Sequence, residues 1–456
     1  MRFFLYLIFF IATAYAVSIN NIIIENPYLI CEKNDNKCIK NQLKICHKDY
    51  KECLKSSKPK IFQALFGKCN IIGRQCNEIL IKKIKPTHEL TSYEPTKENV
   101  RTIGRTAYQD GYLWLGLTGA GIEYKFNGEI TTINVTADTT SYSEDKPAHI
   151  IIYADDEIYL DTVMTEKNTD FKVIFDKKGS HVVRFIKTSE ALFGSIRINE
   201  IKADKKISPT EPEKLKMEFI GDSITCGYGV DGTGTDVFTT RTEDGTKSYA
   251  IKTAKKFHAE YSIVAYSAFC VVPFLAFDGK IMNSVPGIYD RLGYSEKPNE
   301  FDDGVYELQN TIWDQQQFIP DLVVINLGTN DYYFGQNIAT DNYETVKADY
   351  VDRYEKFITQ IRSLYPETKI LCTLGMMGQE LYTEIEEAVN NYTSKTGDTN
   401  VKSFKLSVQN TEKNGLGTDG HPNAKSHVDA TYEIVEAIEK LFGWKSDKDV
   451  NIELTD

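Results

Sequence analysis

Three short stretches of the sequence carry the residue types that acyl transfer requires. Ser223 ends a Gly-Asp-Ser stretch, Asn330 lies in Gly-Thr-Asn-Asp, and His421 stands two residues after Asp419. A serine hydroxyl becomes a good nucleophile when a neutral histidine takes its proton, and the oxyanion that forms needs hydrogen-bond donors. We therefore predict Ser223 as the nucleophile, His421 as the base and Asp419 as the group that orients the imidazole. The Ser223 backbone N–H and the Asn330 amide are the candidate oxyanion donors.

Each of these residues also has a structural interpretation when it is taken alone. Serine and asparagine are common in turns at strand ends, and a histidine can lie at the start of a helix. The residues gain meaning together, because each follows a predicted parallel strand and the carboxyl ends of such strands meet at one edge of the sheet. His421 also precedes Pro422, and proline is favoured at the first position of a helix. The Gly-x-Ser-x-Gly motif of α/β-hydrolases is absent from the sequence.

The elements that must position these residues lie in residues 206–456. Apolar, β-branched stretches alternate there with helical patterns, which predicts a parallel sheet with helices on both faces. The predicted strands are LKMEFIGDS, YSIVAYSAF, PDLVVINLGTND, KILCTLGMM and VKSFKLSV. The fold class of this part is therefore α/β, with three layers.

Residues 100–205 have a different pattern. Short segments rich in Ile, Val, Tyr, Phe and Thr follow one another, with Gly, Asp and Asn between them. Strands at this spacing without helices predict an all-β sandwich. Residues 91–99 are polar and contain Pro95, so we predict a linker there.

The amino-terminal part combines an export signal with a cysteine-rich module. Residues 1–16 hold Arg2, an apolar run too short to span a bilayer, and an Ala-x-Ala ending, which predicts a signal peptide. We therefore expect a secreted, extracellular protein, in which cysteines form disulfides. Residues 17–90 hold six of the nine cysteines and predict a small, disulfide-linked and helical module.

The six cysteines stand in three pairs, each with six residues between its members. They are Cys31, Cys38, Cys46, Cys53, Cys69 and Cys76. This spacing fits no common zinc motif, and the cysteines allow many connectivities. An antiparallel helical hairpin would join the first to the fourth and the second to the third, and would leave the last two to each other. The other three cysteines are scattered, and we expect buried free thiols.

Composition limits the partners of the protein. The net charge is −12, so nucleic acid is not an expected partner. No later segment could span a bilayer, so we expect no membrane association. The sequence shows neither a metal-binding cluster nor a cofactor motif, so we expect no metal and no cofactor. Two sequons make Asn134 and Asn391 candidate glycosylation sites.

The amino-terminal module differs in charge from the rest. Residues 17–95 carry fourteen Lys and Arg against eight Asp and Glu. Such a cationic surface suits acidic wall polymers or a protein partner. The alternative is that the module is a disulfide-stabilised spacer.

The motifs together resemble a known family. GDSITCGYGV, PDLVVINLGTNDYY and TDGHPNAKSH are similar to the motifs of the SGNH (GDSL-type) hydrolases, whose sheet is flavodoxin-like. With RFIKTSEALFG before them, residues 100–445 look most like carbohydrate esterase family 2, which joins a jelly-roll sandwich to an SGNH domain. The resemblance implies a secreted acetyl xylan esterase that removes O-acetyl groups from plant polysaccharides such as xylan or glucomannan. It implies the same roles for Ser223, His421 and Asn330.

The sequence departs from the family pattern at two places. Most SGNH hydrolases have Asp-x-x-His, whereas Asp419 is only two residues before His421, so the triad role of Asp419 is open. The usual Ser-Gly-x-Gly after the second strand is replaced by Ser-Ala-Phe-Cys. The backbone N–H groups of Ala268 and Cys270 are then the remaining oxyanion donors.

Aromatic residues near these motifs suit a sugar, because rings pack on the apolar faces of pyranoses. The candidate substrate-binding residues are Trp313, Tyr228, Asp331 and Tyr332. For Trp313, packing before the third strand is the structural alternative. Two other functions stay open: an SGNH lipase or lysophospholipase, and a catalytically inactive carbohydrate-binding protein.

Overall fold

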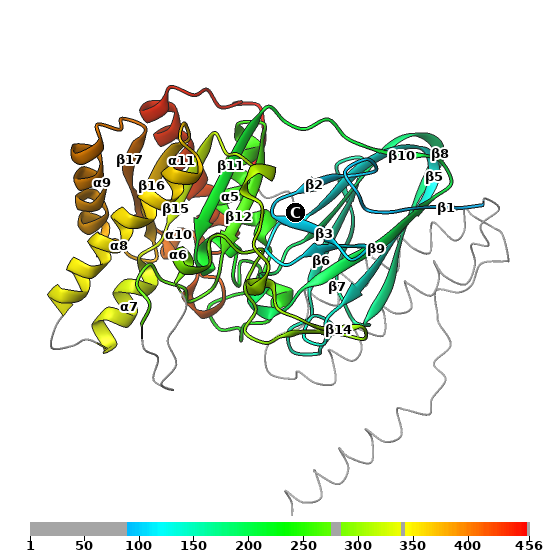
Figure 1. Cartoon of the computed structure of the whole chain (residues 1–456), viewed down its shortest axis with the longest axis horizontal. Helices are drawn as coiled ribbons and strands as arrows, with labels where there is room; N and C mark the ends of the chain where they lie inside the picture. Colours follow the sequence, from blue (N-terminus) through cyan, green and yellow to red (C-terminus); the bar gives the residue numbers. More distant parts are fainter. Residues whose placement is uncertain (1–88, 275–283, 339–342, 454–456) are drawn as a thin grey trace, which may run out of the picture. The chain divides into compact units, whose positions relative to one another are not determined.

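The computed structural model describes residues 89–274, 284–338 and 343–453 (Figure 1). The predicted signal peptide, nearly all of the cysteine-rich module and its six cysteines lie outside these residues. No helix in the described ranges has the length and apolar character needed to cross a membrane. Residues 89–456 form one compact unit, which contains a β-domain followed by an α/β domain.

The β-domain consists of one antiparallel sheet with ten strands, in the order β3-β4-β9-β5-β8-β6-β7, with β1, β2 and β10 attached to its sides. The strands are β1 (Thr91–Tyr93), β2 (Arg101–Ile103), β3 (Thr106–Gln109), β4 (Tyr112–Leu115), β5 (Gly121–Ala137), β6 (His149–Ala154), β7 (Glu157–Val163), β8 (Asn168–Lys187), β9 (Ile196–Ala203) and β10 (Ile207–Pro209). The long strands β5 and β8 pair along most of their length, with a register shift between Gly128 and Ile130. Such bulges increase twist, and the sheet curls around a single apolar core. The all-β prediction is confirmed.

The two predicted domain junctions carry strands of the β-domain. β1 lies inside the predicted linker 91–99 and pairs with β9, Thr91 opposite Ala203. β10 lies beyond residue 205 and pairs with β5, Ile207 opposite Phe126. Both strands have three residues, too few to show an alternating pattern in the sequence.

The α/β domain contains five parallel strands in the order β12-β11-β15-β16-β17. They are β11 (Leu215–Gly221), β12 (Ala259–Ala265), β15 (Leu322–Asn326), β16 (Lys369–Met376) and β17 (Val401–Val408). This order is flavodoxin-like, and the predicted parallel sheet is confirmed. Its central strands are largely buried on both faces, as a sheet covered on two sides requires, and the buried Glu218 of β11 pairs with Arg105.

Helices cover both faces of this sheet. The helices are α4 (Ser223–Cys226), α5 (Tyr249–Lys256), α6 (Val285–Ile288), α7 (Thr329–Ile338), α8 (Tyr343–Leu364), α9 (Tyr382–Thr396), α10 (Thr411–Asn414) and α11 (Ala424–Phe442). α5 and α11 share one core with alternate strand residues such as Phe219 and Val324. α8 and α9 share the other core with Ile220 and Ile325.

Short elements complete the two domains. They are the hairpin β13 (Asn299–Phe301) and β14 (Gly304–Tyr306), and the 3₁₀ turns η1 (Ala191–Phe193), η2 (Thr240–Thr242), η3 (Gly245–Lys247), η4 (Leu308–Asn310), η5 (Gln315–Gln317) and η6 (Thr418–Gly420).

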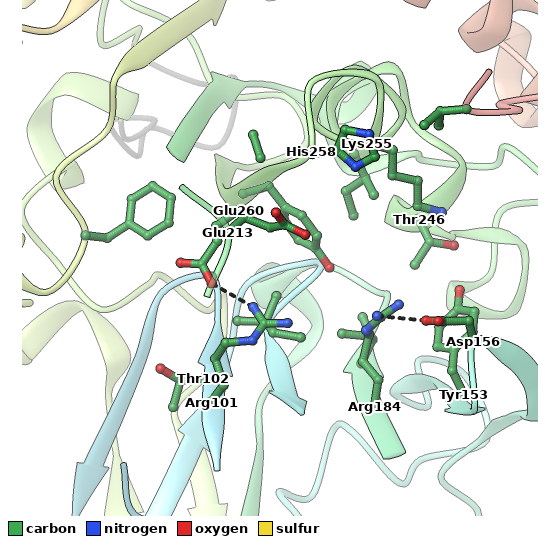
Figure 2. A pocket seen from close by; sticks show the side chains of 18 residues that line it. Arg101, Thr102, Tyr153, Asp156, Arg184, Glu213, Thr246, Lys255, His258 and Glu260 are labelled. Atoms are coloured by element: carbon green, nitrogen blue, oxygen red, sulfur yellow. Dashed lines mark hydrogen bonds and ion pairs between the residues drawn. The ribbon is translucent and has the colours of Figure 1, made fainter. Parts of the chain in front are cut away.

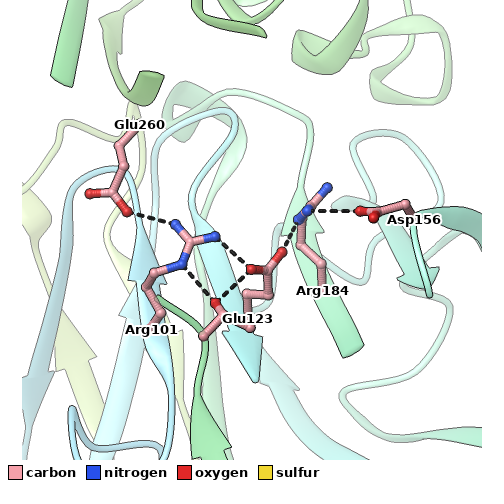
Figure 3. A network of polar contacts seen from close by, with 6 residues as sticks. Arg101, Glu123, Asp156, Arg184 and Glu260 are labelled. Atoms are coloured by element: carbon pink, nitrogen blue, oxygen red, sulfur yellow. Dashed lines mark hydrogen bonds and ion pairs between the residues drawn. The ribbon is translucent and has the colours of Figure 1, made fainter. Parts of the chain in front are cut away.

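Charged side chains join the two domains far from the carboxyl ends of the strands. Arg101 of β2 bonds Glu260 of β12 and Glu123 of β5, each at 2.7 Å. Glu123 also pairs with Arg184, which contacts Asp156 (Figure 3). Since Glu260 lies near the amino end of β12, this network ties the domains together at the end of the sheet opposite Ser223.

Candidate active site

Ser223 lies at the carboxyl end of β11, at the first position of α4. Asp222 caps the helix, because its Oδ1 accepts the backbone N–H of Ile224 at 3.0 Å. A Cβ on Gly221 would lie 2.0 Å from the hydroxyl oxygen of Thr225, so only glycine allows this strand-to-helix turn. The turn leaves Ser223 mostly buried, with 7% of its surface exposed.

His421 lies beside Ser223, although 198 positions separate the two residues. It follows η6 and precedes α11, which Asn423 caps by accepting the backbone N–H of Ser426. Nε2 of the imidazole is 2.8 Å from the Ser223 Oγ. Nδ1 is 3.2 Å from the carbonyl oxygen of Thr418. If Nδ1 donates its proton to that carbonyl, Nε2 is the atom that accepts the serine proton.

The protonation state of His421 suits a base. Burial lowers the pKa of the imidazole below its usual value, although the Thr418 carbonyl and the charge of Asp419 oppose this effect. The ring is therefore neutral near pH 7, as a general base must be.

Asp419 differs from the prediction. Its carboxylate accepts the hydroxyl of Tyr228 at 2.9 Å, and the Nδ1 position of His421 is served by the Thr418 carbonyl. The backbone explains the difference, since Asp419 has φ +52° and stands only two residues before the histidine. The group that orients the His421 imidazole is therefore the Thr418 carbonyl and not the predicted Asp419 carboxylate.

The loop of residues 267–272, called here the 267–272 loop, follows β12 next to Ser223. Nδ2 of Asn330 donates to the carbonyl oxygen of Phe269 at 3.1 Å and lies 3.5 Å from Asp222. Ala268 is exposed and has φ +64°, a region that glycine adopts far more readily. Cys270 is buried, and its carbonyl accepts the backbone N–H of Val285 at 2.9 Å. The loop thus keeps, with alanine, a backbone conformation typical of glycine.

Two of the predicted substrate-binding residues, Asp331 and Trp313, are buried and bond to backbone groups, which corrects their predicted role in sugar binding. Asp331 is 0% exposed, and its carboxylate accepts the backbone N–H groups of Val271 and Val272. Trp313 is buried, its Nε1 donates to the Thr106 carbonyl at 2.9 Å, and Arg105 stacks on its ring at 4.6 Å. Trp313 therefore belongs to the junction of the two domains.

The other two predicted substrate-binding residues, Tyr332 and Tyr228, have different neighbours. Tyr332 packs against Tyr343 of α8, with ring centroids 6.2 Å apart. The ring of Tyr228 is 4.4 Å from the His421 imidazole and stacks on Phe238 at 3.7 Å. Tyr228 thus contacts a candidate catalytic residue, whereas Tyr332 packs on a helix.

The sequence analysis missed the continuation of this aromatic surface. Phe238 contacts Phe193 of the β-domain at 5.4 Å, and the Lys146 ammonium lies 4.3 Å from the Phe238 ring. Tyr228, Phe238, Phe193 and Lys146 form what we call the aromatic wall. Their positions scatter along the chain, so no local motif signals them.

A cavity of about 530 Å³ lies elsewhere, at the junction of the domains (Figure 2). Arg101, Arg184, Lys255, His258 and Glu260 are among the residues that line it. It lies at the amino end of β12, and no candidate catalytic residue is part of its lining. We therefore assign the candidate active site to the surroundings of Ser223 and not to this cavity.

The structure also describes the three scattered cysteines and the two candidate glycosylation sites. Cys226, Cys270 and Cys372 are buried free thiols, as expected. Asn134 lies within β5, and its amide donates to Asp170 at 2.6 Å. Asn391 lies on α9 and is half-buried. Glycosylation of either asparagine stays a prediction.

Two family models match the chain, one on each domain. "Carbohydrate esterase 2 N-terminal" matches residues 102–212, and "GDSL-like Lipase/Acylhydrolase" matches residues 217–431. The first match covers most of the β-domain, and the second covers most of the α/β domain. Together the two matches support carbohydrate esterase family 2, the family that the motifs resemble.

Relatives and solved structures agree with this family. The chain is 30% identical to Cellulase/esterase CelE from Acetivibrio thermocellus over 59% of its own length, but it spans only 31% of that relative. It is 24% identical to an acetylxylan esterase / glucomannan deacetylase from Cellvibrio japonicus, covering 78% of this chain and 92% of the relative. An acetyl xylan esterase structure from the rumen bacterium Butyrivibrio proteoclasticus aligns with TM-score 0.69 and 24% identity, covering 78% of this chain and 99% of that one. This structural likeness supports the two-domain family fold.

Proposed function

We propose that this protein is a serine carbohydrate esterase that removes O-acetyl groups from plant cell-wall polysaccharides such as acetylated xylan or glucomannan. The observation that carries the proposal is the 2.8 Å contact between the Ser223 hydroxyl and Nε2 of His421. The names of the relatives, acetylxylan esterase and glucomannan deacetylase, support the substrate class.

In the first step His421 acts as base. Nε2 takes the Ser223 proton while Oγ forms a bond to the acetyl carbonyl carbon, and the carbonyl electron pair moves to the oxygen. The Ser223 backbone N–H and the Asn330 amide are the proposed donors to this oxyanion, together with the backbone N–H groups of Ala268 and Cys270. The charged imidazole is stabilised through Nδ1–H by the Thr418 carbonyl.

The intermediate then collapses. The bond between the acetyl carbon and the sugar oxygen breaks, and His421 returns its proton to that oxygen, which leaves as a sugar hydroxyl. A water molecule attacks the acetyl-enzyme with His421 as base, and acetate leaves while Ser223 regains its proton. The sum is one ester bond hydrolysed by one water, and the proposed steps call for neither a metal nor a cofactor.

We propose that the sugar ring lies on the aromatic wall. Tyr228 is in contact with His421 and continues through Phe238 to Phe193 of the β-domain. A pyranose with its apolar face on these rings would place an acetylated oxygen near Ser223.

The remaining sequence predictions belong to the same proposal. Residues 1–16 direct secretion, and the cysteines of residues 17–90 form disulfides in the extracellular medium. The curled β-domain is a jelly-roll sandwich. The cationic module contacts an acidic wall polymer or a protein partner. Support comes from the residue patterns alone, and mass spectrometry of the secreted, non-reduced protein would test the first two statements.

The deciding experiment measures acetate release from acetylated xylan, acetylated glucomannan and long-chain acyl esters, with Ser223→Ala as control. We expect Ser223-dependent release from the polysaccharides and little hydrolysis of long-chain esters. Preference for long acyl chains would support the lipase alternative. If both proteins are equally inert while they bind the glycans, the protein is a binding module and not an esterase.

A further inference from the structure

Glu190 belongs to the β-domain, yet its carboxylate contacts two segments of the α/β domain. It directly precedes η1 and is 0% exposed. Oε2 accepts the backbone N–H of Ser267 at 2.8 Å, and Oε1 accepts the hydroxyl of the same residue. The Sγ of Cys226 lies 3.9 Å from Oε2. Since Cys226 lies on α4, this carboxylate joins the helix of Ser223 to the 267–272 loop.

Ser267 is the first residue of the loop that carries the candidate backbone donors. The far end of the loop is held by Asp331, which accepts the N–H groups of Val271 and Val272. Its middle is held by Asn330 through the Phe269 carbonyl. Glu190 is thus the contact that fixes the beginning of the loop, directly before Ala268 with its positive φ.

Glu190 is itself held by a buried lysine. Nζ of Lys187, at the end of β8, donates to the carbonyls of Gly116, Ser189 and Glu190 at 2.9, 2.7 and 3.0 Å. Lys187 is 1% exposed, and all three ammonium protons have acceptors. The backbone carbonyl of Glu190 is therefore held by Lys187 of the β-domain and not by the 267–272 loop.

The charged groups around Glu190 come from several elements. They are Lys187 of β8, Asp222 before α4, the thiol of Cys226 on α4, Glu243 after η2, and Glu296 before β13. Burial raises the pKa of Glu190 to about 7, while the Ser267 bonds and Lys187 oppose the rise. An ionised carboxylate can accept both Ser267 bonds, whereas a protonated one uses one oxygen as a donor.

We propose that Glu190 is a positioning residue for the acyl transfer, through which the β-domain holds the 267–272 loop in place against α4. The β-domain is then part of the catalytic apparatus as well as a neighbour of the sugar. This inference rests on the proposed esterase function.

The main test compares Glu190→Ala and Glu190→Gln with Glu260→Gln. Glu260 is a matched control, because it also joins the two domains through a carboxylate, by its bond to Arg101. It lies five residues before Ala265 on β12, about 16 Å along the strand at ~3.3 Å per residue. We expect kcat on an aryl acetate to fall about 100-fold in Glu190→Ala and about 10-fold in Glu190→Gln, with KM changed less than about 3-fold. Glu260→Gln should keep the wild-type kcat.

A second variant approaches the contact from the other side. Ser267→Ala removes the hydroxyl but keeps the backbone N–H bond, so its kcat should fall less than that of Glu190→Ala. This variant tests the same contact if Glu190→Ala folds poorly. Equal kcat in wild type, Ser267→Ala and Glu190→Gln would overturn the proposal.

The pH profile separates positioning from general destabilisation. In the wild type, kcat/KM should fall as the pH drops through about 7, where Glu190 takes up a proton. In Glu190→Gln the acid limb should move down to the titration of His421, whose pKa is lowered by burial. Burial also raises the pKa of Asp222 and of Asp331 to about 7. An acid limb that stays in place would therefore assign the limb to one of these carboxyls and contradict a titrating role for Glu190.

Hydrogen exchange of the loop is independent of activity. Backbone amides of residues 266–272 should exchange faster in Glu190→Ala than in wild type. Their exchange rates in Glu260→Gln should equal those of the wild type. If the wild type shows no Ser223-dependent hydrolysis, the esterase function fails, but this exchange still tests the contact. Unchanged exchange in Glu190→Ala would overturn the positioning proposal alone.

Discussion

The imidazole of His421 is oriented by the carbonyl oxygen of Thr418, which lies 3.2 Å from Nδ1. A backbone carbonyl can fix the tautomer as a carboxylate does, but it carries no full charge to stabilise the imidazolium. The proposed catalytic unit is therefore a Ser–His pair held by the main chain.

Asp419 should be dispensable for the chemical step. We expect Asp419→Asn to change kcat on an aryl acetate less than about 10-fold, whereas loss of the carboxylate from a Ser-His-Asp triad costs about 10⁴-fold. Asparagine is the proper replacement, since it tolerates the positive φ of this position. A loss of about 10⁴-fold would mean that the carboxylate orients His421 during turnover.

Asn330 should act mainly on the transition state. Asn330→Ala removes a candidate oxyanion donor, so kcat should fall about 100- to 1,000-fold with little change in KM. Because Asn330 also bonds the Phe269 carbonyl, thermal unfolding of the variant should be measured alongside. A large rise in KM with unchanged kcat would assign Asn330 to substrate binding instead.

Ala268 should be a site of backbone strain. A left-handed conformation costs a non-glycine residue roughly 1–2 kcal/mol, and Ala268 has φ +64°. Ala268→Gly should raise the free energy of unfolding by up to about 1 kcal/mol, because the greater entropy of unfolded glycine offsets part of the gain. Ala268→Val is the control and should be less stable than the wild type, since branched residues disfavour this region. Equal stability of all three proteins would exclude strain at this position.

His149 should make stability depend on pH. Burial disfavours its charge, but the bond to Asp161 at 2.7 Å and the nearby Asp244 raise its pKa to about 9. The unfolded value is about 6.5, so this stabilisation is complete below about pH 6.5 and is lost as the pH rises through about 9. Urea unfolding should show a larger difference between wild type and His149→Gln at about pH 6 than at about pH 9.5. A difference that is the same at both pH values would contradict this assignment.

The placement of Ser223, Asn330 and His421 could be predicted because it follows from topology. Each residue ends or follows an apolar strand, and parallel strands bring their carboxyl ends together. The structure indeed brings Ser223 to 2.8 Å from His421. No such rule exists for the aromatic wall, whose residues come from loops of both domains.

The incorrect predictions concern residues whose partners are distant in sequence. Trp313 looked available to a sugar, yet Arg105 of the β-domain stacks on it and the Thr106 carbonyl accepts its N–H. Asp331 adjoins Asn330 but points toward backbone N–H groups of the 267–272 loop. Glu190 had one signal in the sequence. Lys187 and Glu190 are the only charged residues between Arg184 and Arg197, and charged residues in such an apolar stretch are buried only with polar partners.

The central claim is that Ser223 forms a covalent acetyl-enzyme. Rapid-quench mass spectrometry of the enzyme with an aryl acetate measures this most directly, with His421→Ala and Asp419→Asn as comparisons. The account predicts the added mass of one acetyl group on the peptide that contains Ser223 in wild type and Asp419→Asn, and strongly reduced labelling in His421→Ala. Turnover of the aryl acetate by Ser223→Ala at the wild-type rate, or acetyl label on another residue, would contradict it.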